Sequence, residues 1–383
     1  MIDYLQSKEQ EMLFMLERLV NKDSGSHYKK GVDTVGKILS NEYKLLNFKV
    51  DIVEQTDVGN HLLIRHKDAT SPKIVILGHL DTVFKEGTVK ERPFKIRGSR
   101  AYGPGVIDMK GSHVTLLYAL KALIESGCEE AYKNVHIIYN SDEEIGSTTS
   151  HVLIENIALG KQYALIMEPA RPDGSFVSAR RGGGHYDLKI YGKAAHAGIA
   201  PEDGISAIEE ISHKIIKLQK LNRIQEGINV NVGIVKGGES ANVICPYAEA
   251  VIDIRIDKLE QGLTIDQEIR EICKKADVPG AIIELEGGIN RSPMVKNEGT
   301  VKLLKMIQEV CEELGLQITD VSTGGNSDAS FTSNVGVPTI DGLGPIGGNA
   351  HSEDEYLEIP SLVERTLLLS KIIKRLSECE NKS

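Results

Sequence analysis

The pattern of apolar and polar residues changes partway along the chain. Up to about Val177, short runs that are apolar at almost every position alternate with stretches of helical periodicity. Such continuous runs are typical of strands buried on both faces of a parallel sheet, and those at 73–77, 135–139 and 163–167 are examples. This order predicts an α/β fold with a doubly wound, mostly parallel sheet.

Beyond this point the pattern indicates smaller, half-exposed elements. Residues 185–191 alternate between polar and apolar, and 204–221 form an amphipathic helix whose apolar side carries Ile205, Ile208, Ile211, Ile215 and Leu218. We expect strands at 228–235, 248–256 and 281–286, and a helix at 264–275. The order strand-helix-strand-strand-helix-strand predicts a ferredoxin-like α+β domain inserted into the first. Helices at 301–314 and 361–377 then return the chain to the first domain.

We therefore expect two domains, one formed by residues 1–178 and 293–383 and the other by 179–292. A length of 383 residues exceeds what one simple hydrophobic core holds. With 40% hydrophobic and 26% charged residues, the composition is that of a soluble globular enzyme.

The net charge argues against one class of partner, and the cysteines and the first residues indicate the compartment. The net charge of -10, without a stripe of lysine and arginine, argues against nucleic acid. The cysteines are odd in number, form no Cys-x-x-Cys motif and suit a reducing compartment; they are Cys128, Cys245, Cys273, Cys311 and Cys379. The first residues do not resemble a signal peptide, and no run of 18 apolar residues could span a membrane. We expect a cytoplasmic protein.

Metal-ligand side chains follow two of the predicted buried strands. Glu143 and Glu144 come just after the run at 135–139, and two adjacent carboxylates at a strand end are costly unless a cation lies close by. His79 follows the run at 73–77, and Asp81 is placed to fix the tautomer of its imidazole. Read alone, His79 and Asp81 also fit an ordinary polar pair at a strand end.

Three further segments carry the same kind of residue. Asp108 lies in a glycine-rich turn before an apolar helix at 114–124, where it fits either a bridging ligand or an N-cap. Glu168 ends the run at 163–167, and His351 lies in a loop too rich in glycine for a core segment. So many oxygen and nitrogen donors at strand ends and turns predict a metal site.

The order and the sequences of these segments resemble the motifs of one family, the co-catalytic zinc exopeptidases. This family includes bacterial glutamate carboxypeptidases, succinyl-diaminopimelate desuccinylases and acetylornithine deacetylases. The resemblance extends from Ser24 to His351. It is carried by HLDTV at 79–83, GVIDMKG at 105–111, DEEIGS at 142–147, Glu168-Pro169, GKAAHAG at 192–198 and His351.

The resemblance implies two Zn²⁺ ions per chain, although Co²⁺ and Mn²⁺ also suit carboxylate and imidazole ligands. His79 and Glu168 would bind one ion, Glu144 and His351 the other, and Asp108 would bridge them. Two such ions polarise a scissile carbonyl and lower the pKa of a shared water. Glu143 would then be the general base, and Asp81 would support His79.

The resemblance also assigns residues outside the metal site. His196 would reach into the active site of a partner subunit, which makes the inserted domain a lid and dimerisation domain and the protein a homodimer. Asn242 and Arg255 match positions that hold the carboxylate of the substrate, and Arg255 has the planar fork suited to it. Gly347 and Gly348 of the His351 loop are expected to contact substrate.

Three functions follow from this resemblance. The first is a carboxypeptidase that releases a C-terminal amino acid from a small peptide, with glutamate carboxypeptidases as the best match. The second is hydrolysis of N-acyl or N-carbamoyl amino acids, as in a desuccinylase, and the third is a non-catalytic metal-dependent binding protein. The best match is incomplete, because Phe176 occupies the position of a lysine that receives the glutamate side chain. Arg180 and Arg181 are the alternatives for that role.

Overall fold

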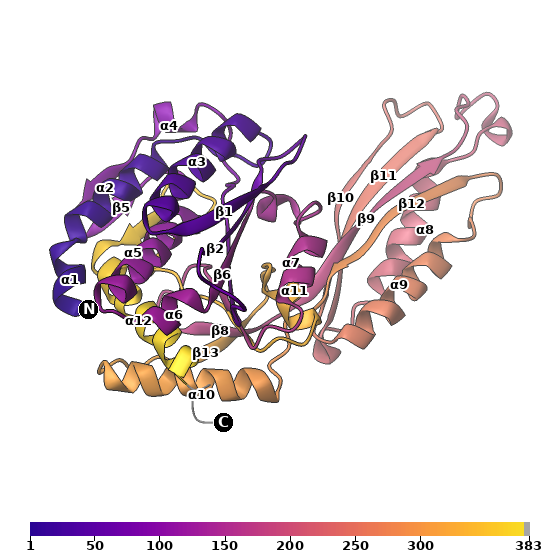
Figure 1. The fold of residues 1–383 in the computed structure, drawn as a ribbon. Helices are drawn as coiled ribbons and strands as arrows, with labels where there is room; N and C mark the ends of the chain where they lie inside the picture. The colour runs from indigo at the N-terminus through magenta and orange to yellow at the C-terminus, as the bar shows by residue number, and fades with distance from the viewer. Residues whose placement is uncertain (379–383) are drawn as a thin grey trace. The chain divides into compact units, whose positions relative to one another are not determined.

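The computed structural model describes residues 1–378, which form two compact units (Figure 1). Unit 1 contains Met1–Ala179, Lys296–Ser322 and the chain from Ser327 onward, and unit 2 contains Arg180–Val295 and Thr323–Asn326. Cys379 lies outside the described residues; the other four cysteines are free. Among residues 1–378, no helix has the length and apolar character needed to cross a membrane.

Unit 1 is built on a six-stranded sheet in the order β1-β2-β6-β3-β7-β14. Its strands are β1 (Phe48–Val53), β2 (His61–His66), β3 (Ile74–His79), β6 (Val135–Asn140), β7 (Tyr163–Ile166) and β14 (Thr339–Ile340). β6, β3, β7 and β14 run parallel to one another, whereas β2 runs antiparallel to both β1 and β6. The predicted mostly parallel sheet is therefore confirmed, with its antiparallel pairing confined to one edge.

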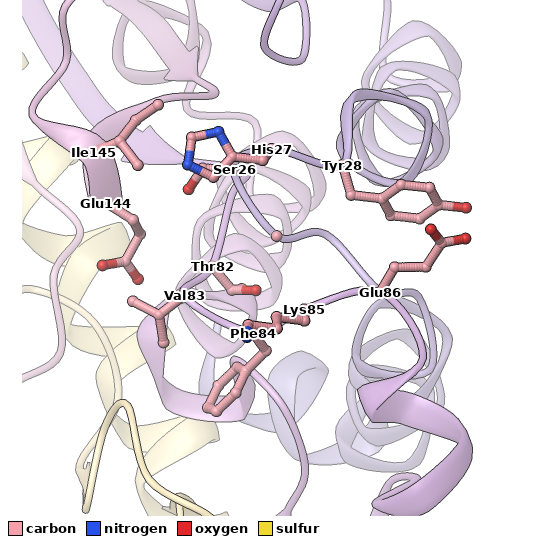
Figure 2. Close-up of a pocket in the computed structure, with 11 residues that line it drawn as sticks. Ser26, His27, Tyr28, Thr82, Val83, Phe84, Lys85, Glu86, Glu144 and Ile145 are labelled. Atoms are coloured by element: carbon pink, nitrogen blue, oxygen red, sulfur yellow. The ribbon is translucent and has the colours of Figure 1, made fainter.

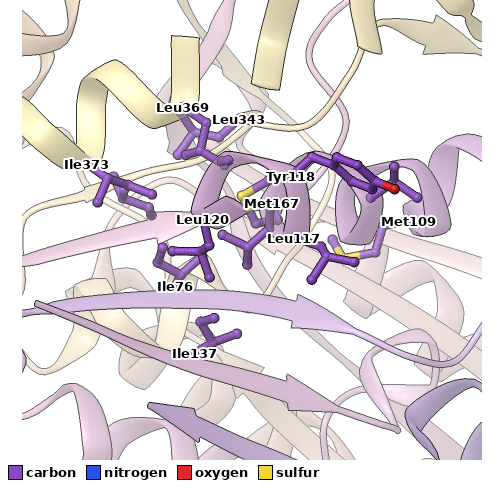
Figure 3. Close-up of a cluster of buried hydrophobic side chains, with 14 of the residues drawn as sticks. Ile76, Met109, Leu117, Tyr118, Leu120, Ile137, Met167, Leu343, Leu369 and Ile373 are labelled. Atoms are coloured by element: carbon purple, nitrogen blue, oxygen red, sulfur yellow. The ribbon is translucent and has the colours of Figure 1, made fainter. Parts of the chain in front are cut away.

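Helices cover both faces of this sheet. In Figure 1, α5 and α12 lie on one side of it, and α7 and α11 lie on the other. The helices of unit 1 are α1 (Ile2–Ser7), α2 (Glu9–Val20), α3 (Lys29–Leu45), α4 (Thr88–Glu91), α5 (Gly111–Glu125), α6 (Glu129–Lys133), α7 (His151–Ala158), α10 (Glu298–Glu313), α11 (Ala329–Asn334) and α12 (Ile359–Glu378). Figure 3 shows Ile76 of β3, Leu120 of α5 and Leu369 of α12 in one buried cluster, which joins sequence-distant helices to the sheet.

Short strands complete unit 1. One small sheet has the order β15-β16-β5-β4, and β8 pairs with β13. Their bounds are β4 (Lys95–Arg97), β5 (Arg100–Tyr102), β8 (Phe176–Arg180), β13 (Asp320–Thr323), β15 (Gly347–Gly348) and β16 (Tyr356–Glu358). The pairing of β16 with β5 holds the C-terminal loop against a segment that lies some 250 residues earlier in the chain.

Unit 2 has the ferredoxin-like arrangement predicted from the sequence. Its antiparallel sheet has the order β10-β11-β9-β12, and helices α8 and α9 pack on it. The elements in chain order are β9 (Gly182–Tyr191), α8 (Ala207–Gln219), β10 (Ile228–Gly237), β11 (Tyr247–Ile256), α9 (Leu259–Cys273) and β12 (Ile282–Arg291). The outer strands β10 and β12 are the two edges of the sheet.

Glycine and capping residues explain where the observed elements differ from the predicted ones. Strand β9 begins three residues earlier than expected, at Gly182. Glycine allows the neighbouring strands to pair closely there, since a Cβ at Gly183 or Gly184 would come within 2.3 Å of a backbone oxygen on a neighbouring strand. Helix α9 begins at Leu259, where the Gln261 side chain accepts the N–H groups of residues 257 and 258. Both features lie in polar or glycine-rich sequence without a clear hydrophobic period.

The buried side of α8 also differs from the prediction. Ile208 is 43% exposed, so its expected place in the apolar side is wrong. The buried positions instead include Glu210 and Lys214, whose side chains form an ion pair of 3.0 Å. Lys214 also contacts Asp277 at 2.7 Å, and this pairing allows two charged side chains to be fully buried.

Candidate metal centre

Three neighbouring strands of unit 1 deliver metal-ligand side chains to one edge of the sheet. β3 ends at His79, a 3-10 turn with Glu143 and Glu144 follows β6, and Glu168 comes two residues after β7. Because β3 lies between β6 and β7 and runs parallel to both, the carboxyl ends of all three strands meet. This is the crevice in which open α/β sheets bind ligands.

The donor atoms form two groups that share one carboxylate. His79 Nε2 lies 3.1 Å from Asp108 Oδ1 and 3.7 Å from Glu168 Oε1. On the other side, His351 Nε2 lies 3.2 Å from Asp108 Oδ2 and 3.2 Å from Glu144 Oε2. The two oxygens of Asp108 therefore face different histidines, an arrangement that suits a carboxylate bridging two ions.

The carboxylates and imidazoles of this cluster shift one another's pKa. Burial lowers the pKa of His79, but hydrogen bonds with Asp108 and Asp81 outweigh it and hold that pKa well above its usual range. Hydrogen bonds with Asp108 and Glu144 raise the pKa of His351 to about 10. Burial and the nearby Asp108 charge raise the pKa of Glu168. The carboxylates thus hold protons on both histidines, and metal ions would displace these protons on binding.

The residues present fit a pair of divalent ions. One oxygen of Glu144, Oε1, is buried and has no hydrogen-bond partner among the described residues. A buried carboxylate oxygen without a partner is rare, and an ion is a common reason for one. Imidazole and carboxylate donors suit Zn²⁺, Co²⁺ and Mn²⁺ alike, and five donors for two ions leave positions for water and substrate.

Asp81 supports both His79 and the Glu143–Glu144 turn. His79 Nδ1 lies 3.0 Å from the backbone oxygen of Asp81 and 3.5 Å from its carboxylate. The carboxylate accepts the backbone N–H groups of Glu143 and Glu144, each at 3.2 Å, and the Ser26 hydroxyl at 2.7 Å. The contact with His79 agrees with the sequence reasoning, whereas the support of the two glutamates did not follow from it.

Glu355 is a buried acid of the site that sequence reasoning missed. Its Oε1 accepts the N–H groups of Ile107 at 2.9 Å and Asp108 at 3.1 Å, and its Oε2 accepts that of Gly105 at 3.1 Å. The side chain is 1% exposed, and burial raises its pKa to about 7 against the opposing effect of these bonds. Nothing in the acidic run 353–355 distinguishes this residue from its neighbours.

Three of the expected substrate-contact residues lie in unit 2, at two places. His196 and Asn242 are close together, because residues 196 and 243 are paired and the Ala197 N–H donates to the Asn242 carbonyl at 3.0 Å. Arg255 lies near the far end of β11, where its guanidinium contacts Asp253 at 3.0 Å. At about 3.3 Å per residue, the two ends of the ten-residue strand β11 are roughly 30 Å apart.

Two other positions with expected roles lie in tightly packed surroundings. A Cβ on Gly347 would lie 2.1 Å from the Tyr356 carbonyl oxygen, so glycine is needed there for packing; a contact of Gly347 and Gly348 with substrate stays a prediction. Phe176 is fully buried in the core of unit 1, with the Arg365 guanidinium 4.9 Å from its ring centre. Of the two alternative arginines, Arg181 is paired with Asp257 at 2.6 Å.

Known proteins are similar to this chain in sequence and in fold. Residues 75–375 match the model of peptidase family M20/M25/M40. The chain is 30% identical over 363 residues to carboxypeptidase G2 of Pseudomonas sp. (strain RS-16), covering 94% of this chain and 87% of that protein. It is 25% identical over 355 residues to acetylornithine deacetylase of Buchnera aphidicola subsp. Schizaphis graminum, covering 88% and 89%.

Solved structures show the same fold. The M20 family metallo-carboxypeptidase Sso-CP2 of Sulfolobus solfataricus superposes with a TM-score of 0.80 at 19% identity, covering 96% of this chain and 99% of that one. Aminopeptidase PepT of Bacillus cereus gives a TM-score of 0.78 at 21% identity, covering 96% and 98%. These likenesses extend over nearly the whole chain, so both units belong to the shared architecture.

Proposed function

Since the chain belongs to peptidase family M20/M25/M40 and is thus a metal-dependent peptidase or amidohydrolase, we propose that it is a carboxypeptidase with two metal ions. It cleaves the amide bond that precedes the C-terminal amino acid of a small peptide. The observation that carries this proposal is the pair of donor groups around Asp108, to which His79 and His351 each contribute one imidazole.

In this proposal each side chain has one task. His79 and Glu168 would hold one Zn²⁺ ion, Glu144 and His351 would hold the other, and Asp108 would serve both. When bound, such ions would supply Lewis acidity and lower the pKa of a water molecule. Glu143 takes the proton from the attacking water and gives it to the leaving amine. Support comes from its backbone, which the Asp81 carboxylate fixes at 3.2 Å.

The leaving amino acid needs a group that recognises its carboxylate. Asn242 and Arg255 are proposed for this role, and His196 is proposed to stabilise the oxyanion. His196 and Asn242 lie at one end of the sheet of unit 2, and Arg255 lies at the other end. A single copy of unit 2 therefore does not bring all three to one substrate. We therefore propose a homodimer in which His196 and Asn242 act in the site of the partner.

Unit 2 has the exposed apolar surface that such a dimer requires. Its edge strand β10 exposes Ile234 and Val235, and α8 exposes Ile208 and Ile216. An unpaired edge strand with exposed apolar side chains readily pairs with a second chain. These elements are the proposed dimer contact.

A panel of dipeptides and N-acyl amino acids tests the function. The protein loaded with Zn²⁺ should release the C-terminal amino acid. Glu143→Ala should lower the rate by a factor of about 10² to 10⁴ while retaining its metal. Glu130→Ala, at an exposed acid in the first turn of α6, is the matched control and should retain full activity. A Glu143→Ala enzyme with more than about a tenth of the wild-type rate would place the base elsewhere.

The second candidate is an N-acyl amino acid amidohydrolase, which uses the same chemistry. It is favoured by the similarity to acetylornithine deacetylase and by the burial of Phe176, which leaves no group at that position to recognise a glutamate side chain. Preferential cleavage of N-acetyl or N-succinyl amino acids over dipeptides in the same panel would support it.

A further inference from the structure

Unit 1 contains a cavity that is separate from the metal centre. Figure 2 shows the cavity next to Glu144, which adjoins the metal-ligand side chains. The separate one, of about 320 Å³, shares no lining residue with it and lies at the edge of the six-stranded sheet, between residues 33–44 of α3 and residues 52–62 of β1 and β2. Ligand pockets measure about 300–1,000 Å³, so an occupant of this edge cavity is small.

The packing of α3 on the sheet gives the edge cavity an apolar floor. At Gly36 the helix lies against β2, since a Cβ there would be 3.5 Å from Leu62 Cδ1. Ile52 of the edge strand β1 is paired with Leu62, so both side chains lie on the same face of the sheet. One turn after Gly36, the small side chain of Ser40 leaves the space towards Ile52 unfilled, and Ile52 remains 55% exposed.

One end of the edge cavity is fixed by polar contacts. The Asp33 carboxylate accepts the Asn60 N–H at 2.7 Å and pairs with Lys29 at 3.0 Å. The side-chain oxygen of Asn60 in turn accepts the Gln55 N–H at 2.9 Å. The charge of Asp33 is thus balanced by Lys29, and the cavity is formed before a ligand arrives, which lowers the cost of binding.

The helix side of the edge cavity carries hydrogen-bond donors and positive charge. Lys37, Ser40 and Lys44 are three and four residues apart, which places them on one face of α3. Ser40 is only 5% exposed, yet its hydroxyl makes no hydrogen bond within residues 1–378. Neither lysine is paired with a carboxylate in the described part of the chain. The lysines lie one turn before and one turn after Ser40, about 10 Å apart along the helix axis.

We propose that the edge cavity binds a small aliphatic carboxylate. Lys37 and Lys44 attract the carboxylate, and the Ser40 hydroxyl donates a hydrogen bond to it. The aliphatic chain packs on Ile52 and Leu62. A cation would meet two like charges, and an uncharged apolar molecule would leave the buried hydroxyl without a partner. This site is independent of the proposed function, because it uses neither the metal ions nor the residues assigned to catalysis.

An NMR titration of protein with labelled isoleucine methyl groups tests this proposal. Hexanoate should shift the Ile52 methyl signal, which is assigned by its loss in Ile52→Val, with a Kd of about 1 mM or lower. Hexanol and hexylamine have the same chain without the negative charge and should bind at least about tenfold more weakly. The Ile52 signal reports on the edge cavity whether or not hexanoate also contacts the metal centre.

Two double variants separate the lysines of the edge cavity from surface charge in general. Lys37→Gln with Lys44→Gln, both at exposed positions, should raise the Kd of hexanoate at least about tenfold. Lys302→Gln with Lys305→Gln, at two exposed positions of α10, changes the net charge equally and should leave the Kd unchanged. The proposal is overturned by an Ile52 signal that does not shift up to about 10 mM hexanoate. Equal affinity for hexanol, or an unchanged Kd in the Lys37 and Lys44 double variant, would overturn it as well.

Discussion

Replacing Glu355 by glutamine tests how the bridging carboxylate is held in place. Glutamine keeps one acceptor oxygen but presents an NH₂ group to one of the three backbone N–H groups that Glu355 accepts. Losing one charge-assisted hydrogen bond in a buried site costs about 1.5–3 kcal/mol. Glutamine also avoids the cost of ionising a buried carboxyl whose pKa is raised to about 7, so we expect Glu355→Gln to lower the free energy of unfolding by at most about 2 kcal/mol.

The alanine variant gives the upper end of this effect. Glu355→Ala leaves three buried donors without a partner, and each costs about 1–3 kcal/mol. Water entering the vacated space satisfies part of this demand, so we expect a loss of about 3–5 kcal/mol. Because one of these donors is the N–H of Asp108, metal affinity should fall by about 10- to 100-fold in both variants.

Two assays measure these effects. Urea unfolding of metal-free protein at pH 8 gives the free energy, since the Glu355 carboxyl with its pKa of about 7 is then ionised. Competition with a chromophoric chelator gives the metal affinity. The control is Glu358→Gln, which removes a partly exposed ion pair with Arg100 and should cost no more than about 1 kcal/mol. If Glu355→Gln changes neither the free energy of unfolding nor the metal affinity, the anchoring role of Glu355 is refuted.

Three further predictions concern the metal ions, the subunits and acid stability. His351→Ala should lower the metal content from about two equivalents to about one, measured by elemental analysis after reloading. Mixing Glu143→Ala with His196→Ala should restore roughly a quarter of wild-type activity, because half of the dimers then contain one intact site. Hydrogen bonds with Lys214 and then Lys217 hold the pKa of Asp277 at about 2, below its unfolded value. Its contribution to stability is therefore complete above about pH 4 and is lost as the pH falls towards 2, and Asp277→Asn should remove this dependence in circular dichroism.

Each of these predictions has an outcome that contradicts it. A His351→Ala protein that still holds two ions would remove His351 from the ligands. Subunit exchange demonstrated by mass labelling, without recovered activity, would place the action of His196 within its own chain or outside catalysis. An acid midpoint that is the same in Asp277→Asn and wild type would assign the acid sensitivity to other carboxyl groups.

Periodicity predicted the fold class because most elements bury apolar side chains at regular spacing. The strands that end at His79 and before Glu143 are mostly apolar runs, and their parallel pairing brings both residues to one edge. Charged residues that are buried in pairs gave no such pattern. Glu210 and Lys214 look like surface residues in the sequence, and only the partner at Asp277 makes their burial favourable.

The donors of the site were predictable for a similar reason, whereas their supports were not. His79, Glu144 and Glu168 follow apolar strands, and this position makes a ligand-type side chain conspicuous. Glu355 and Ser26 act through contacts with backbone groups and side chains far away in the sequence. Such contacts depend on loop conformation, which residue spacing does not encode.

The division of unit 1 by an inserted unit affects how the protein matures during translation. The donors proposed for one ion, at positions 79, 108 and 168, emerge before unit 2 is made, whereas His351 follows it. At about 5–20 residues per second, the ribosome needs roughly 15 to 50 s to pass from His79 to His351. In the proposed assignment, the nascent chain can therefore capture the ion of His79 and Glu168 first. The ion of Glu144 and His351 enters only once the chain has been synthesised almost to its end, and so the enzyme becomes active after, and not during, its synthesis.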